Sequence, residues 1–246
     1  MISMIFYTGI FDIPQMVSFD HAFLSANRLR RRKSDFPANN WIMDSGAFTE
    51  ISMFGHYRHP VSEHADLINR WAVCGNMELA VAQDYMCEPF ILAKTGMTVL
   101  DHQRLTIERY DELLALTDQP IMPVLQGFWP MEYLRHIDLY GGRLKPGMRV
   151  GIGSVCKRNG TPKAIVDVIW ALKAEAPELL YHGFGVKYTA LLNAYIHDAL
   201  YSADSMAWSF AARKQGRDGN SVIEALEYTE KIRLRGGKTV AQLPLI

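Results

Sequence analysis

Short apolar segments alternate with longer amphipathic ones along this chain, and this pattern constrains its fold more than any other feature. Predicted strands lie at residues 4–8, 41–43, 79–83, 121–125, 149–152, 179–181 and 201–203. Apolar residues at helical spacing predict helices within 11–29, 61–73, 98–116, 130–140, 162–176, 188–200 and 221–234. A loop is predicted at 45–59, and a last strand is predicted at 239–243.

Strands that alternate with helices build right-handed βαβ units, and such units form a parallel sheet. Seven or eight strands in roughly 250 residues predict an α/β fold of the (β/α)8 TIM-type barrel class, with some irregular or incomplete elements. An open doubly wound sheet is the alternative. No repeat or linker divides the sequence, so we expect a single domain over residues 1–246.

The composition excludes several classes of protein. Hydrophobic residues make up 49% of the chain and charged residues 21%, which is an ordinary balance for a globular protein. No segment approaches the roughly 18 apolar residues of a membrane span. The apolar start of the chain lacks the basic leader of a signal peptide. We therefore expect a cytoplasmic protein without a membrane partner.

Neither a disulfide framework nor a metal site is predicted. The cysteines are odd in number and widely spaced. They are Cys74, Cys87 and Cys156. A looser group, His56, His59, His64 and Cys74, has ligand-type side chains without a recognised zinc spacing. We expect these four residues in a loop and on a helix surface, and we predict no metal and no cofactor.

Polar or small residues directly follow five of the predicted strands. They are Asp44, Asp84, Gln126, Gly153–Ser154 and Asp204. In a barrel the carboxyl ends of all strands meet at one face, so these residues would share a pocket. Alternatively, the acids cap the helices that follow, and Gln126 satisfies backbone groups.

The predicted pocket would contain carboxylates, a glutamine and glycine amides but no set of metal ligands. This combination suggests covalent catalysis. In such sites one carboxylate is the nucleophile and another handles the proton of the leaving group, as in retaining glycosidases. A glycoside hydrolase that uses Asp44 and Asp204 is therefore one interpretation.

Five short segments, in order along the chain, resemble motifs of the tRNA-guanine transglycosylases. Residues 44–48, Asp-Ser-Gly-Ala-Phe, resemble the family's Asp-Ser-Gly-Gly-Phe/Tyr-Gln, and 124–127, Val-Leu-Gln-Gly, resemble its Val-Gln-Gly-Gly. Residues 151–154, Gly-Ile-Gly-Ser, are similar to its Ile-Gly-Gly segment, and 182–185, His-Gly-Phe-Gly, to its Met-Gly-x-Gly turn. Residues 204–208, Asp-Ser-Met-Ala-Trp, resemble the Asp-Ser-Ala-Ala-Tyr stretch that carries the nucleophile.

This resemblance implies that a guanine in a nucleic acid is exchanged for a 7-deazaguanine. It implies that Asp204 attacks C1′ of the sugar to give a glycosyl-enzyme intermediate. It also implies that Asp44 protonates the departing guanine and later deprotonates the incoming base. Asp84 would accept hydrogen bonds from the guanine N1–H and 2-amino groups.

The resemblance implies further contacts with the base. Gln126 and the amides around Gly153 and Ser154 would recognise the 6-oxo group. Phe48 and His182 would hold the two faces of the base, as aromatic rings commonly hold a flipped base. The base-binding positions are Asp84, Gln126, Gly153, Ser154, Phe48, His182 and Ser45.

Departures from the family pattern favour DNA as the polymer. The zinc motif Cys-x-Cys-x-x-Cys and an added RNA-binding domain are absent from the sequence, and Ala47 and Thr49 replace a glycine and a glutamine of the first motif. These departures favour the DpdA-like branch, whose members insert 7-deazaguanines into DNA and include compact phage forms. The expected partners are DNA, guanine and a base such as 7-cyano-7-deazaguanine, in the host cytoplasm if a phage encodes the protein.

Two alternatives stay open beside this interpretation. One is a minimal tRNA-guanine transglycosylase, and the other is a non-catalytic barrel that binds a base or a nucleic acid.

Several basic residues are candidates for contacts with phosphates, although 26 basic and 26 acidic residues balance the net charge. A basic run crowds residues 28–33, where a solvated surface is the alternative. The candidates are Arg28, Arg30, Arg31, Arg32 and Lys33 in the run, and Lys157, Arg158, Lys187 and Arg213 elsewhere.

Overall fold

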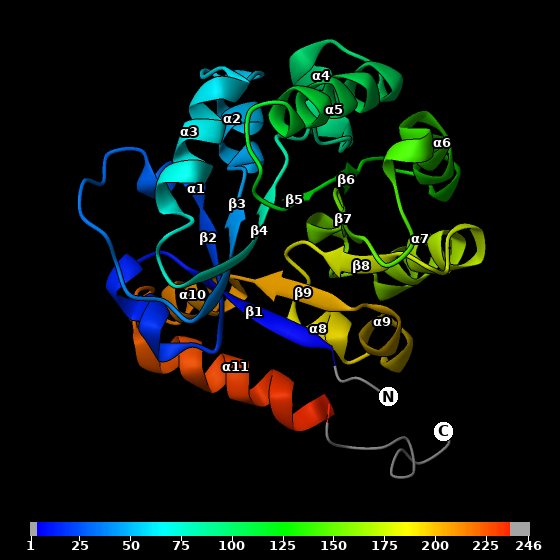
Figure 1. Cartoon of the computed structure of the whole chain (residues 1–246). Coiled ribbons are helices and arrows are strands. Elements are labelled where there is room, and N and C mark those ends of the chain that lie inside the picture. The colour runs from blue at the N-terminus through cyan, green and yellow to red at the C-terminus, as the bar shows by residue number, and fades with distance from the viewer. Residues whose placement is uncertain (1–3, 237–246) are drawn as a thin grey trace, which may run out of the picture.

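The strands of residues 4–236, the part of the chain that this computed structural model describes, run parallel in one sheet (Figure 1). They are β1 (Ile5–Ile10), β2 (His21–Ser25), β3 (Asn40–Asp44), β4 (Asn76–Val81), β5 (Ile121–Met122), β6 (Val124–Leu125), β7 (Arg149–Ile152), β8 (Leu180–Gly183) and β9 (Ser202–Ser205). Their order in the sheet is β5-β4-β3-β2-β1-β9-β8-β7-β6.

The two ends of this sheet meet at Pro123, which closes the sheet into a barrel. β5 pairs with β4 and β6 pairs with β7, and Pro123 alone lies between β5 and β6. Proline has no N–H to give to a ladder, so the strand changes its partner there. The Pro123 carbonyl still accepts a hydrogen bond from Gly151 N at 2.9 Å. The predicted (β/α)8 TIM-type barrel is confirmed, with this broken strand as its irregular element.

Helices cover the outside of the barrel (Figure 1). The longer ones are α2 (Ala47–Phe54), α3 (Val61–Trp71), α5 (Val99–Leu114), α6 (Pro130–Tyr140), α7 (Pro162–Glu175), α10 (Ala207–Lys214) and α11 (Val222–Gly236). The shorter ones are α1 (Ala26–Leu29), α4 (Pro89–Thr95), α8 (Tyr188–Leu191) and α9 (Ala194–Ala199), with 3-10 turns at Ile13–Ser18, Gly141–Arg143 and Cys156–Arg158. No helix within residues 4–236 has the length and apolar character that crossing a membrane requires.

Local sequence signals explain where the main helices begin. A capping box opens α5, because the Thr98 side chain accepts from Asp101 N while the Asp101 carboxylate accepts from Thr98 N. Pro130 and Pro162 occupy the first turns of α6 and α7, where the missing N–H of proline costs nothing.

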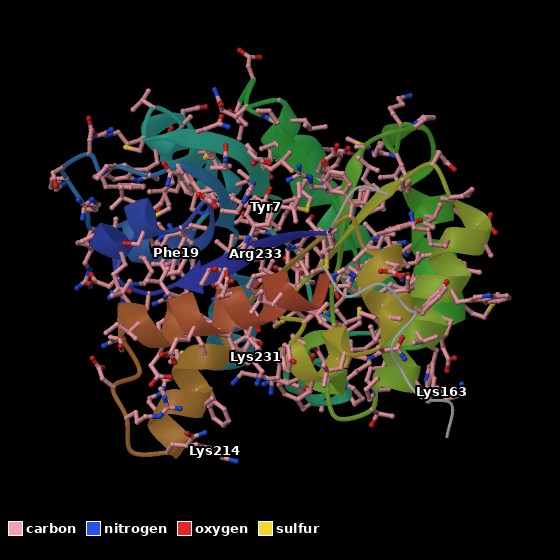
Figure 2. All side chains as sticks on the ribbon, turned by 90° about the horizontal axis from the view of Figure 1, so that it is seen from below. Tyr7, Phe19, Lys163, Lys214, Lys231 and Arg233 are labelled. Atoms are coloured by element: carbon pink, nitrogen blue, oxygen red, sulfur yellow. The ribbon has the colours of Figure 1, made fainter. Side chains whose placement is uncertain are left out.

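Alternate residues of each strand face the inside of the barrel, and the others face the helices. Tyr7, Phe23, Ile42 and Val81, from four neighbouring strands, belong to one buried cluster inside the barrel. Figure 2 shows Tyr7 near the centre of the molecule. Trp41, next to Ile42, belongs instead to the larger cluster between strands and helices. The inner cluster forms a packed floor beneath the carboxyl ends of the strands.

The structure corrects the prediction for residues 11–29. The predicted helix there is replaced by a 3-10 turn, strand β2 and the short helix α1. β2 pairs with both β1 and β3. Phe23 and Leu24, which were predicted to share a helix, lie in opposite layers, because they are neighbours in a strand.

Other segments also differ from the sequence prediction. The predicted loop 45–59 contains α2, and the helices α4 and α10 were not predicted. The predicted helix 188–200 is interrupted before Asn193, whose side chain caps α9 by accepting from Ile196 N at 3.2 Å. The predicted last strand at 239–243 lies outside the described residues.

Candidate active site

A cavity of about 370 Å³ opens at the carboxyl ends of the strands. Among the residues predicted from the sequence, its lining includes Asp44, Phe48, Asp84, Gln126, Gly153, Ser154 and Asp204. Ser45 and His182 are fully buried and do not line it. A second cavity, of about 440 Å³, lies at the amino ends of β1 and β2 against α11 and contains none of these residues.

Alternation along two strands turns both predicted catalytic carboxylates inward. Asp44 ends β3 two residues after Ile42, which belongs to the inner cluster. Asp204 follows Ser202 by two residues in β9, and Ser202 contacts the buried ring of His182. Asp44 and Asp204 therefore face one cavity from strands that are separated in the sheet by β1 and β2.

Asp44 has the surroundings of a group that exchanges a proton. Its Oδ2 accepts a hydrogen bond from Gly46 N at 3.1 Å, but Gly46, not Asp44, is the N-cap of α2. Burial, and then the charge of Asp204, raise the pKa of Asp44 to about 6. A carboxyl group with such a pKa can both give and take a proton near neutral pH.

Asp84 is held by hydrogen bonds from both sides. Ser45 Oγ donates to its Oδ1 at 3.2 Å, and Gln126 Nε2 donates to its Oδ2. Burial, and then the charge of Asp44, raise the pKa of Asp84 to about 7, although these two hydrogen bonds favour the ionised form. Ser45 thus holds Asp84 in place by a hydrogen bond but does not itself line the cavity.

The hydrogen-bonded chain continues from Gln126 to Glu88. Ser154 Oγ lies 2.8 Å from both Gln126 Oε1 and Glu88 Oε2, and it accepts from Cys87 N at 2.9 Å. Contacts at both ends hold the Gln126 amide with its nitrogen toward Asp84 and its oxygen toward Ser154. Ser154 has a φ of 54°, a left-handed conformation that a residue other than glycine adopts at a cost.

The absence of a side chain at Gly153 leaves room for the side chain of Gln126. A Cβ at this position would overlap the amide of Gln126, so only glycine lets Gln126 reach Asp84. The Gly153 N–H donates to Leu125 O within the sheet at 2.9 Å. This amide is therefore not free to bind the 6-oxo group of a base, as the sequence had suggested. Within residues 4–236 the Ser154 N–H has no hydrogen bond, so it is the amide of this turn that is left for such a contact.

His182 positions Asp204. Oδ1 of Asp204 accepts from Gly185 N at 3.0 Å and from His182 Nε2 at 3.3 Å. Burial lowers the pKa of His182, so its ring is neutral at neutral pH. A carboxylate oxygen accepts, and the Ser202 hydroxyl, 2.9 Å from Nδ1, can donate, so we assign the ring proton to Nε2. Oδ2 of Asp204 has no hydrogen bond within residues 4–236.

The geometry does not support His182 as a ring that stacks on a base. Its ring is stacked on Phe23, with 5.6 Å between the ring centres, inside the barrel. Phe184 lines the cavity instead, together with Phe48. The two rings differ in their position along the barrel axis. His182 lies within β8, below the cavity, whereas Phe184 lies just past the carboxyl end of that strand.

Sequence reasoning missed Glu88 as well as Phe184. Glu88 is 2% exposed and lines the cavity with its carboxylate on Ser154. It lies in the coil between β4 and α4, just before Pro89, whereas the predicted site residues directly follow predicted strands. The signal that could have found it is a carboxylate after the apolar residues 85–87, which predict a buried segment.

The basic run 28–33 is partly used within the protein. Arg30 donates to Asn27 Oδ1 at 3.1 Å and lies 3.7 Å from Glu63. Arg32 donates to the carbonyls of Ser34 and Asp35. These two arginines therefore have protein partners where the sequence predicted phosphate contacts.

The rest of the run extends between the two ends of the barrel. Arg28 lies over the ring of Phe11, just past β1, at the end where the cavity opens. The Lys33 carbonyl accepts from Arg70, near the end of α3, which lies at the opposite end. Arg28 is thus the member of this run that is best placed beside the cavity, while Arg31 and Lys33 are exposed farther along.

The other basic candidates lie in segments that follow β7, β8 and β9, at the cavity end. Lys157 is exposed and lies over the ring of Phe48, 4.6 Å from its centre. Arg158 is half-buried and lies over the ring of Phe128 at 4.4 Å. Lys187 and Arg213 are exposed.

In residues 4–236 no group of three or more His, Cys, Asp or Glu side chains is placed to hold a metal ion. His64 is fully buried, not on a helix surface as expected, and its Nε2 contacts Val81 O at 3.1 Å. Cys74 is buried, His56 is exposed, and His59 lies 2.7 Å from Glu63.

Comparison with known proteins adds one finding to this geometry. The chain matches the model of the family described as DpdA, DeoxyPurine in DNA protein A, over residues 6–239. All the residues of the cavity lie inside the matched range. No curated protein matches the chain.

Proposed function

The chain belongs to the DpdA family, DeoxyPurine in DNA protein A, and we propose that it exchanges guanine in DNA for a 7-deazaguanine base through a covalent intermediate on Asp204. Membership of this family makes the chain a transglycosylase-type enzyme of DNA modification. The identity of the bases and the covalent step are our proposal, and they rest on the side chains of the cavity.

One observation carries the proposal: two carboxylates with different surroundings face the same cavity. Asp204 is oriented by two N–H donors on Oδ1, which leaves Oδ2 to attack. Asp44, with a pKa of about 6, is suited to proton transfer near neutral pH. This division of roles is the one that a double displacement at a sugar carbon requires.

The exchange takes two displacement steps at C1′. Asp204 Oδ2 attacks C1′, the bond from C1′ to N9 breaks, and its electron pair leaves with the guanine, which takes a proton from Asp44. The incoming 7-deazaguanine then gives its N9 proton to Asp44, and N9 attacks C1′. This second attack releases the Asp204 carboxylate and leaves Asp44 protonated for the next cycle.

The polar chain in the cavity supplies the contacts for a guanine-like base. Asp84 would accept from N1–H and from the 2-amino group. Gln126 gives one amide hydrogen to Asp84 and has a second for the 6-oxo group, beside the N–H of Ser154. Phe23, Phe48 and Phe184 line the cavity. Because Phe23 is stacked on His182, Phe48 and Phe184 are left for the two faces of the base.

A base in a DNA helix cannot reach these groups without leaving the stack. Asp204 is 7% exposed and Asp84 is 6% exposed, so the target nucleotide has to enter the cavity before C1′ can meet Oδ2. Such flipping costs a few kcal/mol, and contacts with the base and the phosphates have to offset this cost.

The direct test is incubation with guanine-labelled DNA and, separately, labelled tRNA, each with 7-cyano-7-deazaguanine, followed by nucleoside analysis. Asp204→Ala and Asp44→Ala are compared with Asp167→Ala, which removes an exposed carboxylate on α7. We expect the deazaguanine in DNA, loss of labelled guanine, and an adduct that survives denaturation. We expect no exchange in the first two variants and full exchange in the third.

Each other outcome selects a different function. Exchange in tRNA alone would identify the minimal tRNA enzyme, and release of sugar without incorporation would identify a glycoside hydrolase. Base binding without an adduct would identify a non-catalytic barrel. Full exchange by Asp204→Ala would refute the covalent mechanism.

A further inference from the structure

Exposed aromatic rings gather at the end of the barrel where the cavity opens. Each lies in a segment that follows the carboxyl end of a strand. They include Phe11 after β1 (41% exposed), Phe48 after β3 (45%), Trp129 after β6 (66%) and Phe210 after β9 (52%). Single exposed apolar residues are ordinary, but several large rings around one opening indicate a binding surface.

Cations lie over the faces of several of these rings. Their charged groups lie 3.6 Å (Arg28) from the ring centre of Phe11, 4.6 Å (Lys157) from that of Phe48, and 5.9 Å (Lys187) and 5.5 Å (Lys214) from that of Phe210. Within residues 4–236 none of these four cations forms an ion pair with a carboxylate. Their charge is therefore available to an anion.

Arg58 also lies over an aromatic ring, but unlike these four cations it forms an ion pair. Arg58 lies 3.9 Å from the ring centre of Phe54, but two of its nitrogens donate to the carboxylate of Glu50. A buried carboxylate already neutralises Arg58, so this arginine is not part of the binding surface.

Two pairings of an aromatic ring with lysines lie directly beside the cavity. Phe48 lines the cavity, and Lys157 follows the lining residue Cys156. Lys187 lies two residues after Gly185, which also lines the cavity, and Phe210 lies one helical turn after the start of α10. Figure 2 shows Lys214 at the outer end of α10. We call Phe48, Lys157, Lys187, Phe210 and Lys214 the rim.

We propose that the rim binds unpaired nucleotides beside the target guanine, so that the substrate of this protein is single-stranded DNA. This inference rests on the proposed function. Aromatic rings stack on the face of a base only when that face is free, whereas in a duplex both faces of each base are covered by its neighbours. Cations alone would serve a duplex equally well, and the exposed rings are what favours a single strand.

In this proposal the lysines of the rim occupy one position without DNA and another when DNA is bound. Without DNA, each lysine covers the ring face that a base would occupy. When a base takes that face, the ammonium group is displaced toward the phosphate of the same strand. One exchange thus replaces a cation–ring contact by a base–ring contact and an ammonium–phosphate contact.

The experiment is a binding titration by fluorescence anisotropy, without any 7-deazaguanine, so that it does not depend on catalysis. The probes are one labelled guanine-containing DNA strand, the same strand in a duplex, and an RNA strand of the same sequence, at several salt concentrations. The variants are Phe210→Ala and the double variant Lys187→Gln/Lys214→Gln. Trp170→Ala is the matched control, because Trp170 is 64% exposed on α7, away from the rim.

We expect the single DNA strand to bind at least tenfold more tightly than the duplex. Phe210→Ala should weaken its binding about 5- to 100-fold and leave the salt dependence unchanged, since one stacked base is lost. The lysine variant should weaken binding to both DNA forms and reduce the salt slope. Trp170→Ala should bind as the unchanged protein does.

Two results would overturn the inference. One is equal affinity for single strand and duplex, and the other is a Phe210→Ala variant that binds the single strand normally. Tighter binding of RNA than of DNA would overturn the assignment to DNA. Stacking-dependent binding of the DNA strand by a protein that fails the exchange assay would leave this inference intact and refute the proposed exchange, so the two failures are distinguishable.

Discussion

Asp204 acts on Asp44 through space, although the two residues lie on strands that are not neighbours in the sheet. After burial, the charge of Asp204 is the largest cause that raises the pKa of Asp44 to about 6. The negative charge of the proposed nucleophile therefore helps the second carboxylate to hold a proton. This relationship ties the two chemical roles to one geometry.

The first prediction concerns the pH dependence of the two half-reactions. Release of guanine needs protonated Asp44, so its rate should fall about tenfold per pH unit above pH of about 6. Incorporation of the new base needs ionised Asp44. In the adduct Asp204 has lost the charge that helps to raise the pKa of Asp44, so the rate of incorporation should fall only at a pH lower than about 6. Single-turnover release of labelled guanine and chase of the isolated adduct measure the two steps separately. Parallel profiles for both steps would contradict the assignment of Asp44.

The second prediction concerns Asp84→Asn. The pKa of Asp84 is about 7 in the folded protein and about 4 when unfolded, so the folded state gains stability by holding a proton and loses it as the pH rises between these values. Asparagine can keep both hydrogen bonds without a charge. At pH of about 8 the variant should be more stable by on the order of 2 kcal/mol, with no gain at pH of about 4. Thermal unfolding across this range measures the difference.

The same variant should not exchange guanine, because an amide nitrogen would face the donors of the base. A variant that gains stability at high pH and retains exchange would show that Asp84 does not bind the base.

The third prediction concerns His182→Phe. This change keeps the ring that packs on Phe23 and removes the donor to Asp204 Oδ1. Loss of a hydrogen bond to a charged group should slow adduct formation roughly 10- to 100-fold. Guanine binding should change little, because His182 does not line the cavity. The rate of adduct formation and the affinity for free guanine are measured side by side, and a loss of affinity alone would contradict the positioning role.

The fourth prediction compares Gly153→Ala with Gly160→Ala. A Cβ at 153 overlaps the Gln126 amide, whereas a Cβ at 160 meets nothing within 4 Å. The backbone at 153 is fixed by its bonds to Leu125 and Tyr133, so Gln126 is the group that has to move. We expect Gly153→Ala to raise KM for the base at least tenfold, and Gly160→Ala to behave as the unchanged protein does. Equal effects of the two changes would argue against a role for the Gln126 contact.

The barrel and its inward-facing carboxylates could be predicted because they follow from local patterns. The alternation of strands and helices predicts parallel βαβ units. Period-two alternation along β3 and β9 then places Asp44 on the side of Ile42 and Asp204 on the side of Ser202. No long-range information is needed for these steps.

The features that sequence reasoning missed depend on depth and on long-range contacts. His182 and Phe184 have the same parity, and only their position along the barrel axis decides that Phe184 lines the cavity. Glu88 reaches the site through coil that is fixed by its contact with Ser154, from another strand end. β2 was missed because its five residues resemble part of a helix until both neighbouring strands are known.

Along the sequence, Pro123 separates two arms of consecutive strands, which pair with each other through β1 and β9. The arm from β1 to β5 carries Asp44 and Asp84, and the arm from β6 to β9 carries Gln126 and Asp204. Neither arm alone holds both the proposed nucleophile and the proposed proton donor, or both ends of the Asp84–Gln126 contact. We therefore expect a partly folded chain, or a nascent one emerging from the ribosome, to leave DNA unmodified until β9 has paired with β1.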